Sequence, residues 1–284
     1  MRRRSFIAGT ALIAGGPLSA PLALAQKGRP TFHLGAVTYN TLKDFDVEMI
    51  IRVLEGAGFE GVELRTGHKH GIEPSIGREE RARVRHRFEQ SRVRLVSYGT
   101  TCRFQSPVAA ERNAQLEIAK QFVDLAHDTG ASGIKIQPMG FPDGVSQKLT
   151  IQNFGESLQR LGVYGAARKV EIWMEIHGKG TSEPTVAAAI VKAAAHDNVG
   201  VCWNSNPTDL SDGSIKASFA LLQPWIRSVH IHELSDAAYP WHELFSLLNE
   251  AKYHRYTFAE VPASLEPERY LQGYAALWTQ LTRS

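Results

Sequence analysis

Residues 171–177 read EIWMEIH, and this stretch decides the fold. Apolar side chains occupy every second position, and a period of two residues indicates a β-strand. The apolar members, which suit an outer face covered by helices, are Ile172, Met174 and Ile176. The members left to point inward are Trp173, Glu175 and His177. A strand with an apolar outer face and polar inner side chains near its end is typical of a barrel that encloses its working residues.

The same unit recurs on both sides of this stretch, as a short apolar run followed by a longer amphipathic segment. We expect strands at 32–39, 61–65, 94–100, 134–137, 171–177, 199–204, 228–233 and 256–261. We expect helices at 44–57, 78–91, 109–129, 151–169, 185–195, 219–225, 241–251 and 267–281. Strict alternation indicates a parallel sheet, and this number of units in about 250 residues predicts a closed (β/α)8 TIM barrel. An open doubly wound sheet is the alternative, but no G-x-G-x-x-G follows the first strand to support its dinucleotide-binding form.

Residues 1–25 have the pattern of an export signal. Three arginines at 2–4 precede a short apolar run at 6–16, and Ala23-Leu24-Ala25 offers a cleavage site. The order Arg3-Arg4-Ser5-Phe6-Ile7 resembles a twin-arginine signal, although Arg2 replaces the usual Ser or Thr. We therefore expect twin-arginine export, a periplasmic or secreted location and one mature domain at 31–284. An ordinary secretory signal and a retained apolar anchor are the alternatives.

The charge balance limits the partners of the mature chain. The net charge of +3 at pH 7 falls to about zero when residues 1–25, which hold three arginines and no acid, are removed. Such a chain has no broad attraction for nucleic acid or for a membrane surface, so a small-molecule partner is expected. The oligomeric state stays open. The two cysteines, Cys102 and Cys202, fall on non-adjacent strands and are expected to be free and buried.

Four ligand-type residues occur at matched heights on the last four expected strands: Glu175, Asn204, His230 and Glu260. Because one β/α unit separates each from the next, they should converge at the carboxyl end of the barrel. Each alone has a plainer interpretation, as a core histidine or a salt-bridge partner. Burying two carboxylates together without a cation is costly, however. This mostly oxygen ligand set predicts a divalent metal site, with Mn²⁺ preferred and Mg²⁺, Co²⁺ or Zn²⁺ as alternatives.

Further polar and aromatic residues are expected near this point. By alternation, Lys135 and Gln137 point inward from the fourth strand, His232 from the seventh and Asn206 from the sixth, with Glu63 lower on the second. Tyr39 and Trp203 are candidates to stack on a ligand ring, with core packing favoured for Trp203. His68, in the loop after the second strand, could grip a substrate or belong to an ordinary exposed loop.

Four strands carry a family resemblance. The segments WMEIH at 173–177, CWNSN at 202–206, VHIHE at 229–233 and FAE at 258–260 resemble the metal-ligand strands of the xylose isomerase-like barrel superfamily. The resemblance covers the whole mature chain and implies a Glu-Asp-His-Glu metal site. Glu175, His230 and Glu260 match it, and Asn204 departs because Asp is usual there. A second departure is His230-Ile231-His232-Glu233, where H-x-K-D is common.

The resemblance implies a metal-dependent isomerase or epimerase that transfers a proton next to a metal-bound carbonyl of an unphosphorylated sugar. The implied base and acid are Glu175 and Glu260. His177 and His232 could move a proton or hold a hydroxyl, and Lys135 could stabilise negative charge. Support of the neighbouring site residues is the alternative for all three. Residues expected to contact substrate are Tyr39, His68, Gln137 and Asn206. The alternatives are a lyase or dehydratase acting on a 3-keto-glycoside, and a non-catalytic carbohydrate-binding barrel. An endonuclease IV-type enzyme is disfavoured, because no basic groove and no larger ligand cluster is evident.

Overall fold

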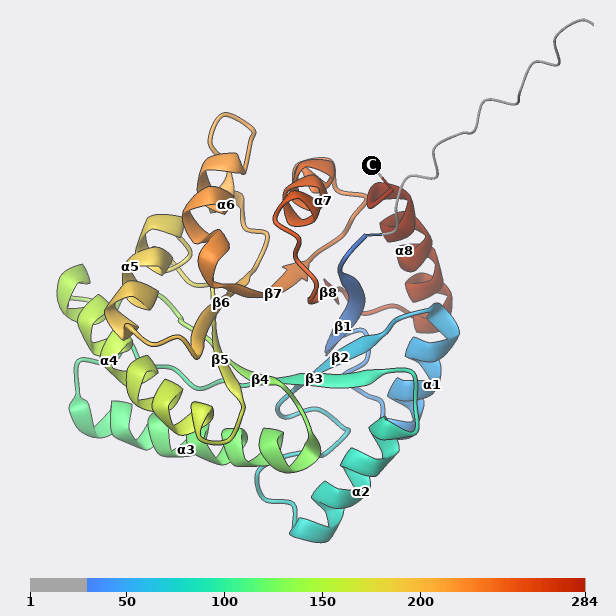
Figure 1. Cartoon of the computed structure of the whole chain (residues 1–284), viewed down its shortest axis with the longest axis horizontal. Coiled ribbons are helices and arrows are strands. Elements are labelled where there is room, and N and C mark those ends of the chain that lie inside the picture. The colour runs from blue at the N-terminus through green and yellow to red at the C-terminus, as the bar shows by residue number, and fades with distance from the viewer. Residues whose placement is uncertain (1–29, 284) are drawn as a thin grey trace, which may run out of the picture.

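The computed structural model describes residues 30–283, which form a closed barrel of parallel strands ringed by helices (Figure 1). The strands are β1 (His33–Asn40), β2 (Gly61–Arg65), β3 (Arg94–Gly99), β4 (Gly133–Ile136), β5 (Glu171–Glu175), β6 (Val199–Trp203), β7 (Ile226–Ile231) and β8 (Tyr256–Val261). The helices are α1 (Val47–Ala57), α2 (Arg78–Glu89), α3 (Ala109–Thr129), α4 (Gln147–Ala166), α5 (Pro184–Ala194), α6 (Lys216–Leu222), α7 (Trp241–Glu250) and α8 (Pro267–Leu281), with short 3-10 turns η1 (Pro207–Asp209) and η2 (Gln223–Trp225). Because β8 pairs in parallel with β1, the sheet closes on itself. The predicted (β/α)8 TIM barrel is confirmed.

Helix α1 shows how local sequence fixes one element of the ring. Asp46 caps its first turn by accepting a hydrogen bond from the Met49 amide at 2.9 Å. Gly58, at φ 79°, ends the helix in a left-handed conformation that glycine adopts at little cost. Between these ends, Ile50 and Leu54 are fully buried. The helix thus packs an apolar stripe onto the outer face of the barrel.

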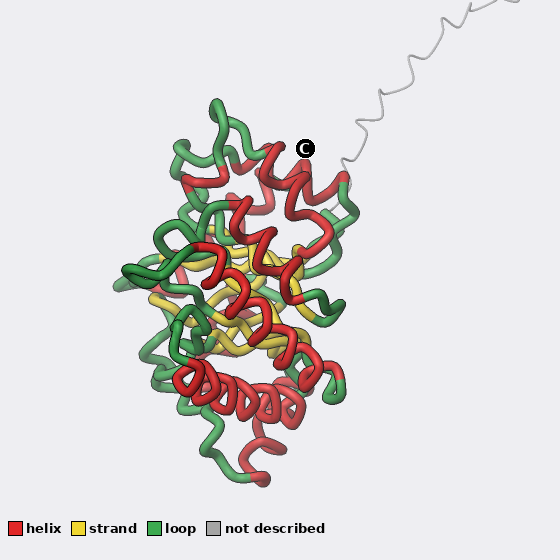
Figure 2. The backbone as a smooth tube through the Cα atoms, turned by 90° about the vertical axis from the view of Figure 1, so that its left-hand side faces the viewer, coloured by secondary structure: helices red, strands yellow, loops and turns green. Residues whose placement is uncertain are grey.

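The main core lies between the barrel and this ring of helices, which enclose the strands in the side view of Figure 2. Outward strand residues fill it from the inside, as Ile172 and Met174 of β5 do. The alternation in residues 171–177 indicated this face. The remaining side chains of β5, Trp173 and Glu175, lie on the other side of the strand, within the barrel.

A smaller apolar layer, which we call the interior plug, lies inside the barrel and consists of Val37, Val96, Trp173, Cys202 and Phe258. A glycine of β4 makes room for the largest of them. A Cβ built on Gly133 would lie 2.6 Å from the Trp173 ring, closer than real Cβ atoms approach. Trp173, Cys202 and Phe258 each precede by two residues one of the expected metal ligands. The plug is therefore the layer directly below the polar carboxyl end.

Five strands end earlier than the sequence predicts: β3 at Gly99, β4 at Ile136, β5 at Glu175, β6 at Trp203 and β7 at Ile231. His177, Asn204 and His232 therefore lie after their strands rather than within them. The prediction extended each strand as long as alternation continued. Alternation of side chains persists for a residue or two after the backbone leaves the ladder, which is why the pattern overshoots.

Two helices were also placed too late. Helix α4 begins at Gln147 and ends at Ala166, instead of 151–169, and α6 spans 216–222 instead of 219–225. Ser146 caps α4 by accepting a hydrogen bond from the Leu149 amide at 3.3 Å. The first turn of α4 is polar and exposed, so the apolar periodicity starts only in its second turn.

Among residues 30–283, no helix combines the length and the apolarity that a membrane span requires. The expected export signal at 1–25 lies outside the described residues. Cys102 and Cys202 are free and buried, as predicted.

Candidate metal centre

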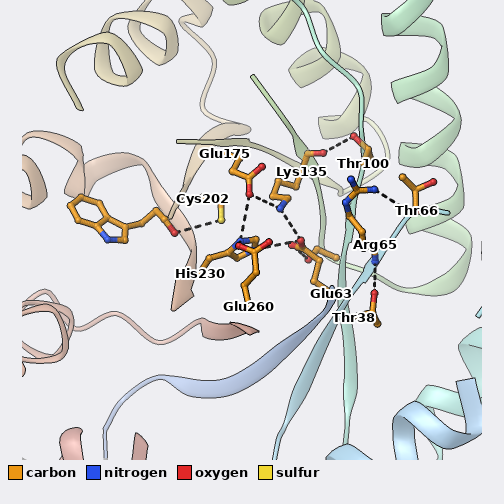
Figure 3. Close-up of polar contacts among 12 residues, drawn as sticks. Thr38, Glu63, Arg65, Thr66, Thr100, Lys135, Glu175, Cys202, His230 and Glu260 are labelled. Atoms are coloured by element: carbon orange, nitrogen blue, oxygen red, sulfur yellow. Dashed lines mark hydrogen bonds and ion pairs between the residues drawn. The ribbon is translucent and has the colours of Figure 1, made fainter. Parts of the chain in front are cut away.

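The carboxyl end of the barrel brings three of the expected ligands together. Ligand atoms of Glu175, His230 and Glu260 lie within 4.8 Å of one another. His230 Nδ1 is 3.2 Å from Glu260 Oε2 and 3.6 Å from Glu175 Oε1. Figure 3 shows these side chains pointing toward one another from β5, β7 and β8. The side chains of His230 and Glu175 are 0% and 2% exposed, whereas Glu260 is 21% exposed and faces the mouth.

Two buried oxygen atoms of the expected ligand set lack a hydrogen-bond partner among the described residues. They are Glu175 Oε2 and Asn204 Oδ1. A buried oxygen left without a donor costs about 1–3 kcal/mol, so a native structure needs a reason to keep it. A divalent cation among these residues would satisfy both atoms. The donor set therefore fits a metal ion.

Glu63 lies beside this group, although the sequence suggested a lower position with no role. Its Oε1 is 3.4 Å from His230 Nε2, and its Oε2 accepts a hydrogen bond from Ser97 at 2.9 Å. Gly99 leaves the space, since a Cβ there would lie 2.8 Å from Glu63 Oε1. A histidine that ligates through one ring nitrogen is commonly oriented by a carboxylate at the other. Glu63 is placed to orient His230 in this way.

Burial alone would raise the pKa of Glu63, but Lys135 and His230 next to it lower that pKa from 4.5 to about 2. The stabilisation from this ionised carboxylate is present above pH 4.5 and is lost as the pH falls toward 2. Burial also opposes a charge on His230, yet the carboxylates of Glu63 and Glu260 raise its pKa well above the usual value. Because a ligating imidazole must be neutral, binding of a cation should release a proton.

Lys135 is the buried cation of the group. Its ammonium lies 2.8 Å from Glu175 Oε1 and 3.3 Å from Glu63 Oε1, and its side chain is 3% exposed. Burial opposes its charge, but these two carboxylates raise its pKa above the ordinary value. Three glutamates and one lysine leave a charge of −2 when His230 is neutral, with Glu260 as the third acid. One divalent cation neutralises that charge.

A chain of hydrogen bonds fixes the orientation of the Asn204 amide. Asn206 Nδ2 donates to the Ile176 carbonyl at 2.6 Å, and a carbonyl can only accept. Asn206 must therefore present Oδ1 to Asn204 Nδ2, which lies 3.4 Å away. Asp209 holds this segment, since its Oδ2 accepts from the Asn206 amide and from the Tyr239 hydroxyl, both at 2.8 Å. The amide oxygen of Asn204 is left as its free atom.

This arrangement predicts that Asn204→Asp will gain less metal affinity than its added charge suggests. The new carboxylate would face Asn206 Oδ1, so two acceptors would oppose each other. In an Asn206→Ala background that conflict is absent. We expect the affinity gain from Asn204→Asp to be larger there by a coupling of about 0.5–3 kcal/mol. Calorimetric titration of the four proteins with Mn²⁺ measures it, and equal gains in both backgrounds would refute the orientation.

The structure puts the other expected site residues in varied places. His232 Nε2 is 3.7 Å from Glu260 Oε2, and its side chain is 39% exposed at the mouth. The ring of His177 is held by the Pro138 carbonyl, 3.0 Å from Nδ1. Gln137 follows β4 and is half-buried, and its backbone amide donates to Cys102.

An aromatic shelf consists of Tyr39, near the end of β1, and His68, in the loop after β2. Their rings stack with centroids 6.2 Å apart and planes 13° apart, and Tyr39 is 42% exposed. Burial, together with His70 and Arg65, lowers the pKa of His68 to about 4, so its ring is neutral at pH 7. His68 is thus held by its neighbours rather than lying in a free loop. Trp203 is fully buried in the main core and donates to Tyr239, which excludes it from stacking on a ligand.

Several solved structures share the fold at low sequence identity. D-psicose 3-epimerase from Clostridium cellulolyticum H10, solved with D-tagatose, has a TM-score of 0.76 at 12% identity and covers 89% of this chain and 100% of its own. The zinc-bound IOLI protein has a TM-score of 0.74 at 15% identity, covering 88% and 98%. The 3-keto-D-glucoside 4-epimerase YcjR from E. coli has a TM-score of 0.73 at 12% identity, covering 88% and 99%.

The sequence itself places the chain in a family. No curated protein matches it. The family model described as xylose isomerase-like TIM barrel matches residues 51–280, which include most of the chain and every strand except β1. The chain therefore belongs to the xylose isomerase-like TIM barrel family.

Proposed function

We propose that this protein is a divalent-metal-dependent isomerase or epimerase acting on an unphosphorylated sugar that carries a carbonyl group. The observation that carries the proposal is the convergence of ligand atoms of Glu175, His230 and Glu260 within 4.8 Å of one another. Asn204, directly after β6, adds a buried amide oxygen without a hydrogen-bond partner among the described residues. The mostly oxygen donor set favours Mn²⁺, with Mg²⁺, Co²⁺ or Zn²⁺ as alternatives. When bound, the metal would polarise the sugar carbonyl and so make the neighbouring C–H bond more acidic.

The chain's own residues would then move the proton. Glu175 and Glu260 reach one volume from strands on different sides of the barrel, so one can take the proton and the other can return it. Lys135 Nζ, 2.8 Å from Glu175 Oε1, holds that carboxylate in position. His232, at the mouth and 3.7 Å from Glu260, can exchange the proton of Glu260 with solvent. Return to the opposite face gives epimerisation, and return to the neighbouring carbon gives isomerisation.

The substrate class follows from the mouth and from two relatives of the same fold. The shelf of Tyr39 and His68 offers an aromatic face, on which the apolar face of a sugar ring can lie. Gln137, Asn206 and His177 are the further candidates for contacts with hydroxyl groups. The names of the two epimerases point to ketoses and keto-glycosides. We also propose that residues 1–25 direct twin-arginine export to the periplasm or beyond, where sugars are usually not phosphorylated.

Solvent exchange tests this proposal directly. The Mn²⁺-loaded protein is expected to incorporate deuterium from D₂O at the carbon next to the carbonyl of a ketose or 3-keto-glycoside, as mass spectrometry would detect. Treatment with a chelator should abolish the exchange, and added Mn²⁺ should restore it, because the ion provides the acidity of the C–H bond. If no sugar in such a panel exchanges at any metal loading, the proposal fails.

A lyase is the second candidate, and the position of His232 favours it. An acid at the mouth, 39% exposed, could protonate a group that leaves from the next carbon of a 3-keto-glycoside. The enolate formed by proton removal would then lose a substituent from the next carbon instead of regaining a proton. Product analysis separates the two, since elimination releases the aglycone or water and epimerisation releases nothing. A non-catalytic sugar-binding barrel would show binding with neither outcome.

A further inference from the structure

A second cavity, of about 650 Å³, opens at the amino end of the barrel, opposite the candidate metal centre. Its walls include the first residues of β3, β5 and β8, namely Arg94, Glu171 and Tyr256. The metal centre lies at the last residues of the strands instead. Trp173 and Phe258 of the interior plug form part of its floor. The interior plug therefore separates the two sites, which have no residue in common.

The cavity concentrates positive charge. Six cationic side chains line it: Arg85, Arg94, Arg168, Lys169, Arg227 and Arg255. Three of them are paired, because Arg85 contacts Glu89, Arg168 contacts Asp124 and Arg255 contacts Glu171. For Arg94, Lys169 and Arg227 the described part of the chain supplies no acidic partner within 4.0 Å. The cavity therefore has about three positive charges that no acidic side chain of the described chain pairs with.

This surplus contrasts with the rest of the described chain. The whole sequence has 32 basic and 29 acidic side chains, and five of the basic ones fall within residues 1–29, which contain no acid. Residues 30–283 thus hold 27 basic and 29 acidic side chains, a net charge of −2. Like charges gathered in one hollow of a slightly acidic body produce a positive local potential, which attracts anions.

The remaining walls define the rest of the ligand. Glu171, the only acid among the lining residues, is already occupied, since it accepts two hydrogen bonds from Arg255 at 2.6 and 2.9 Å and one from Trp173 at 2.8 Å. Arg227 lies flat against β6, because a Cβ built on Gly200 would be 2.3 Å from Arg227 Cγ. The floor offers the partly exposed ring of Tyr256, with the buried rings of Phe258 and Trp173 behind it. An aromatic ring beneath unpaired cations suits a ligand with an anionic group at one end and an apolar group at the other.

We infer that this cavity binds an organic oxyanion: a phosphate- or sulfate-type head held by Arg94, Lys169 and Arg227, on a body of one apolar ring that packs against Tyr256. The volume of about 650 Å³ falls within the range of small-molecule sites. Guanidinium groups suit tetrahedral oxyanions, which they bind through charge-assisted hydrogen bonds. The inference uses no residue of the candidate metal centre and stands independently of the proposed function.

Phenyl phosphate tests the inference by isothermal titration calorimetry of residues 26–284 at pH 8 and constant ionic strength. It should bind about tenfold or more tightly than inorganic phosphate or benzyl alcohol, each of which offers one half of the ligand. Arg94→Gln and Arg227→Gln should each weaken its binding about tenfold. Arg92→Gln is the matched control, because this exposed arginine lies two residues from Arg94 and outside the cavity.

Three outcomes would overturn the inference. One is the absence of saturable binding by phenyl phosphate. Another is an equal loss of affinity in Arg92→Gln and Arg94→Gln, which would reduce the effect to general charge. The third is loss of phenyl phosphate binding in a folded Glu175→Gln variant, which would place the ligand at the metal centre. Retained binding in that variant supports the cavity, whatever the variant does to sugar turnover.

Discussion

Replacing Glu260 by Gln should weaken Mn²⁺ binding by about 100-fold or more, since loss of a mere supporting group of a metal site already costs 10–100-fold. Glutamine keeps an oxygen in place but removes one of the negative charges that offset the cation. Glu260 is also the proposed proton donor or acceptor facing the mouth, at 3.2 Å from His230 Nδ1. Turnover at saturating metal should therefore fall by a further 10²–10⁴-fold, the usual contribution of a general acid or base.

Calorimetry with Mn²⁺ and the deuterium-exchange rate measure these two effects separately. Glu233→Gln is the matched control, because Glu233 follows the same end of β7 but pairs with Tyr270 instead of the centre. It should bind metal and exchange deuterium as the parent does. An affinity within threefold of the parent for Glu260→Gln would exclude Glu260 from the ligand set. Normal exchange at saturating metal would exclude it from proton transfer.

Replacing Lys135 by Met should lower the free energy of unfolding of the metal-free protein by about 3–5 kcal/mol, the usual cost of breaking a buried ion pair from one side. Lys135 is the ammonium between Glu63 and Glu175, whose side chains are 0% and 2% exposed. Without it, both carboxylates stay buried and lose their nearest cation. Denaturant unfolding in the presence of a chelator, followed by circular dichroism, gives the value.

The double variant Glu63→Leu/Lys135→Met is the control for this result. It removes one charge of each sign, so the net charge of the centre is unchanged. We expect it to be more stable than the sum of the two single variants predicts, by about 0.5–3 kcal/mol, because the two side chains interact directly. Additive losses would show that Lys135 and Glu63 act independently. A stable Lys135→Met protein would show that water already solvates these carboxylates.

Much of the fold follows from the sequence because its signals are local. The outward residues of a barrel strand repeat every second position, and the helices between strands repeat every third or fourth. Strand β5 illustrates this, since Ile172 and Met174 alone identify the face that meets the helices. The ends of the elements are less evident. His177 and His232 continue the alternation after hydrogen bonding to the neighbouring strand has stopped.

The candidate site was predictable only in part, for a geometric reason. Spacing along the chain shows which strand a residue belongs to and which side it faces. Its height relative to residues across the barrel depends on strand tilt and stagger, which the sequence does not display. The contact of Glu63 Oε1 with His230 Nε2, at 3.4 Å, was therefore not predicted. The contact between Lys135 and Glu175 is likewise a distance across strands.

The residues that hold Asn206 in place, Asp209 and Tyr239, were not predicted, for a different reason. The hydrogen bond from Tyr239 to Asp209 joins segments 30 residues apart, and no local pattern marks it. Asp209 carries one signal, since a carboxylate closely following a strand end at the active face is a candidate for burial. Burial raises its pKa to about 7, despite the hydrogen bonds that it accepts.

The interior plug closes the barrel below the candidate metal centre, so ligands of the centre enter from the carboxyl end. In the proposed reaction, a metal ion and a sugar would both enter past Glu260, the most exposed of the three converging ligands. The ion would then have to bind before the sugar, and the product would have to leave before the ion. Saturating sugar should therefore lower the rate at which a chelator removes the metal ion.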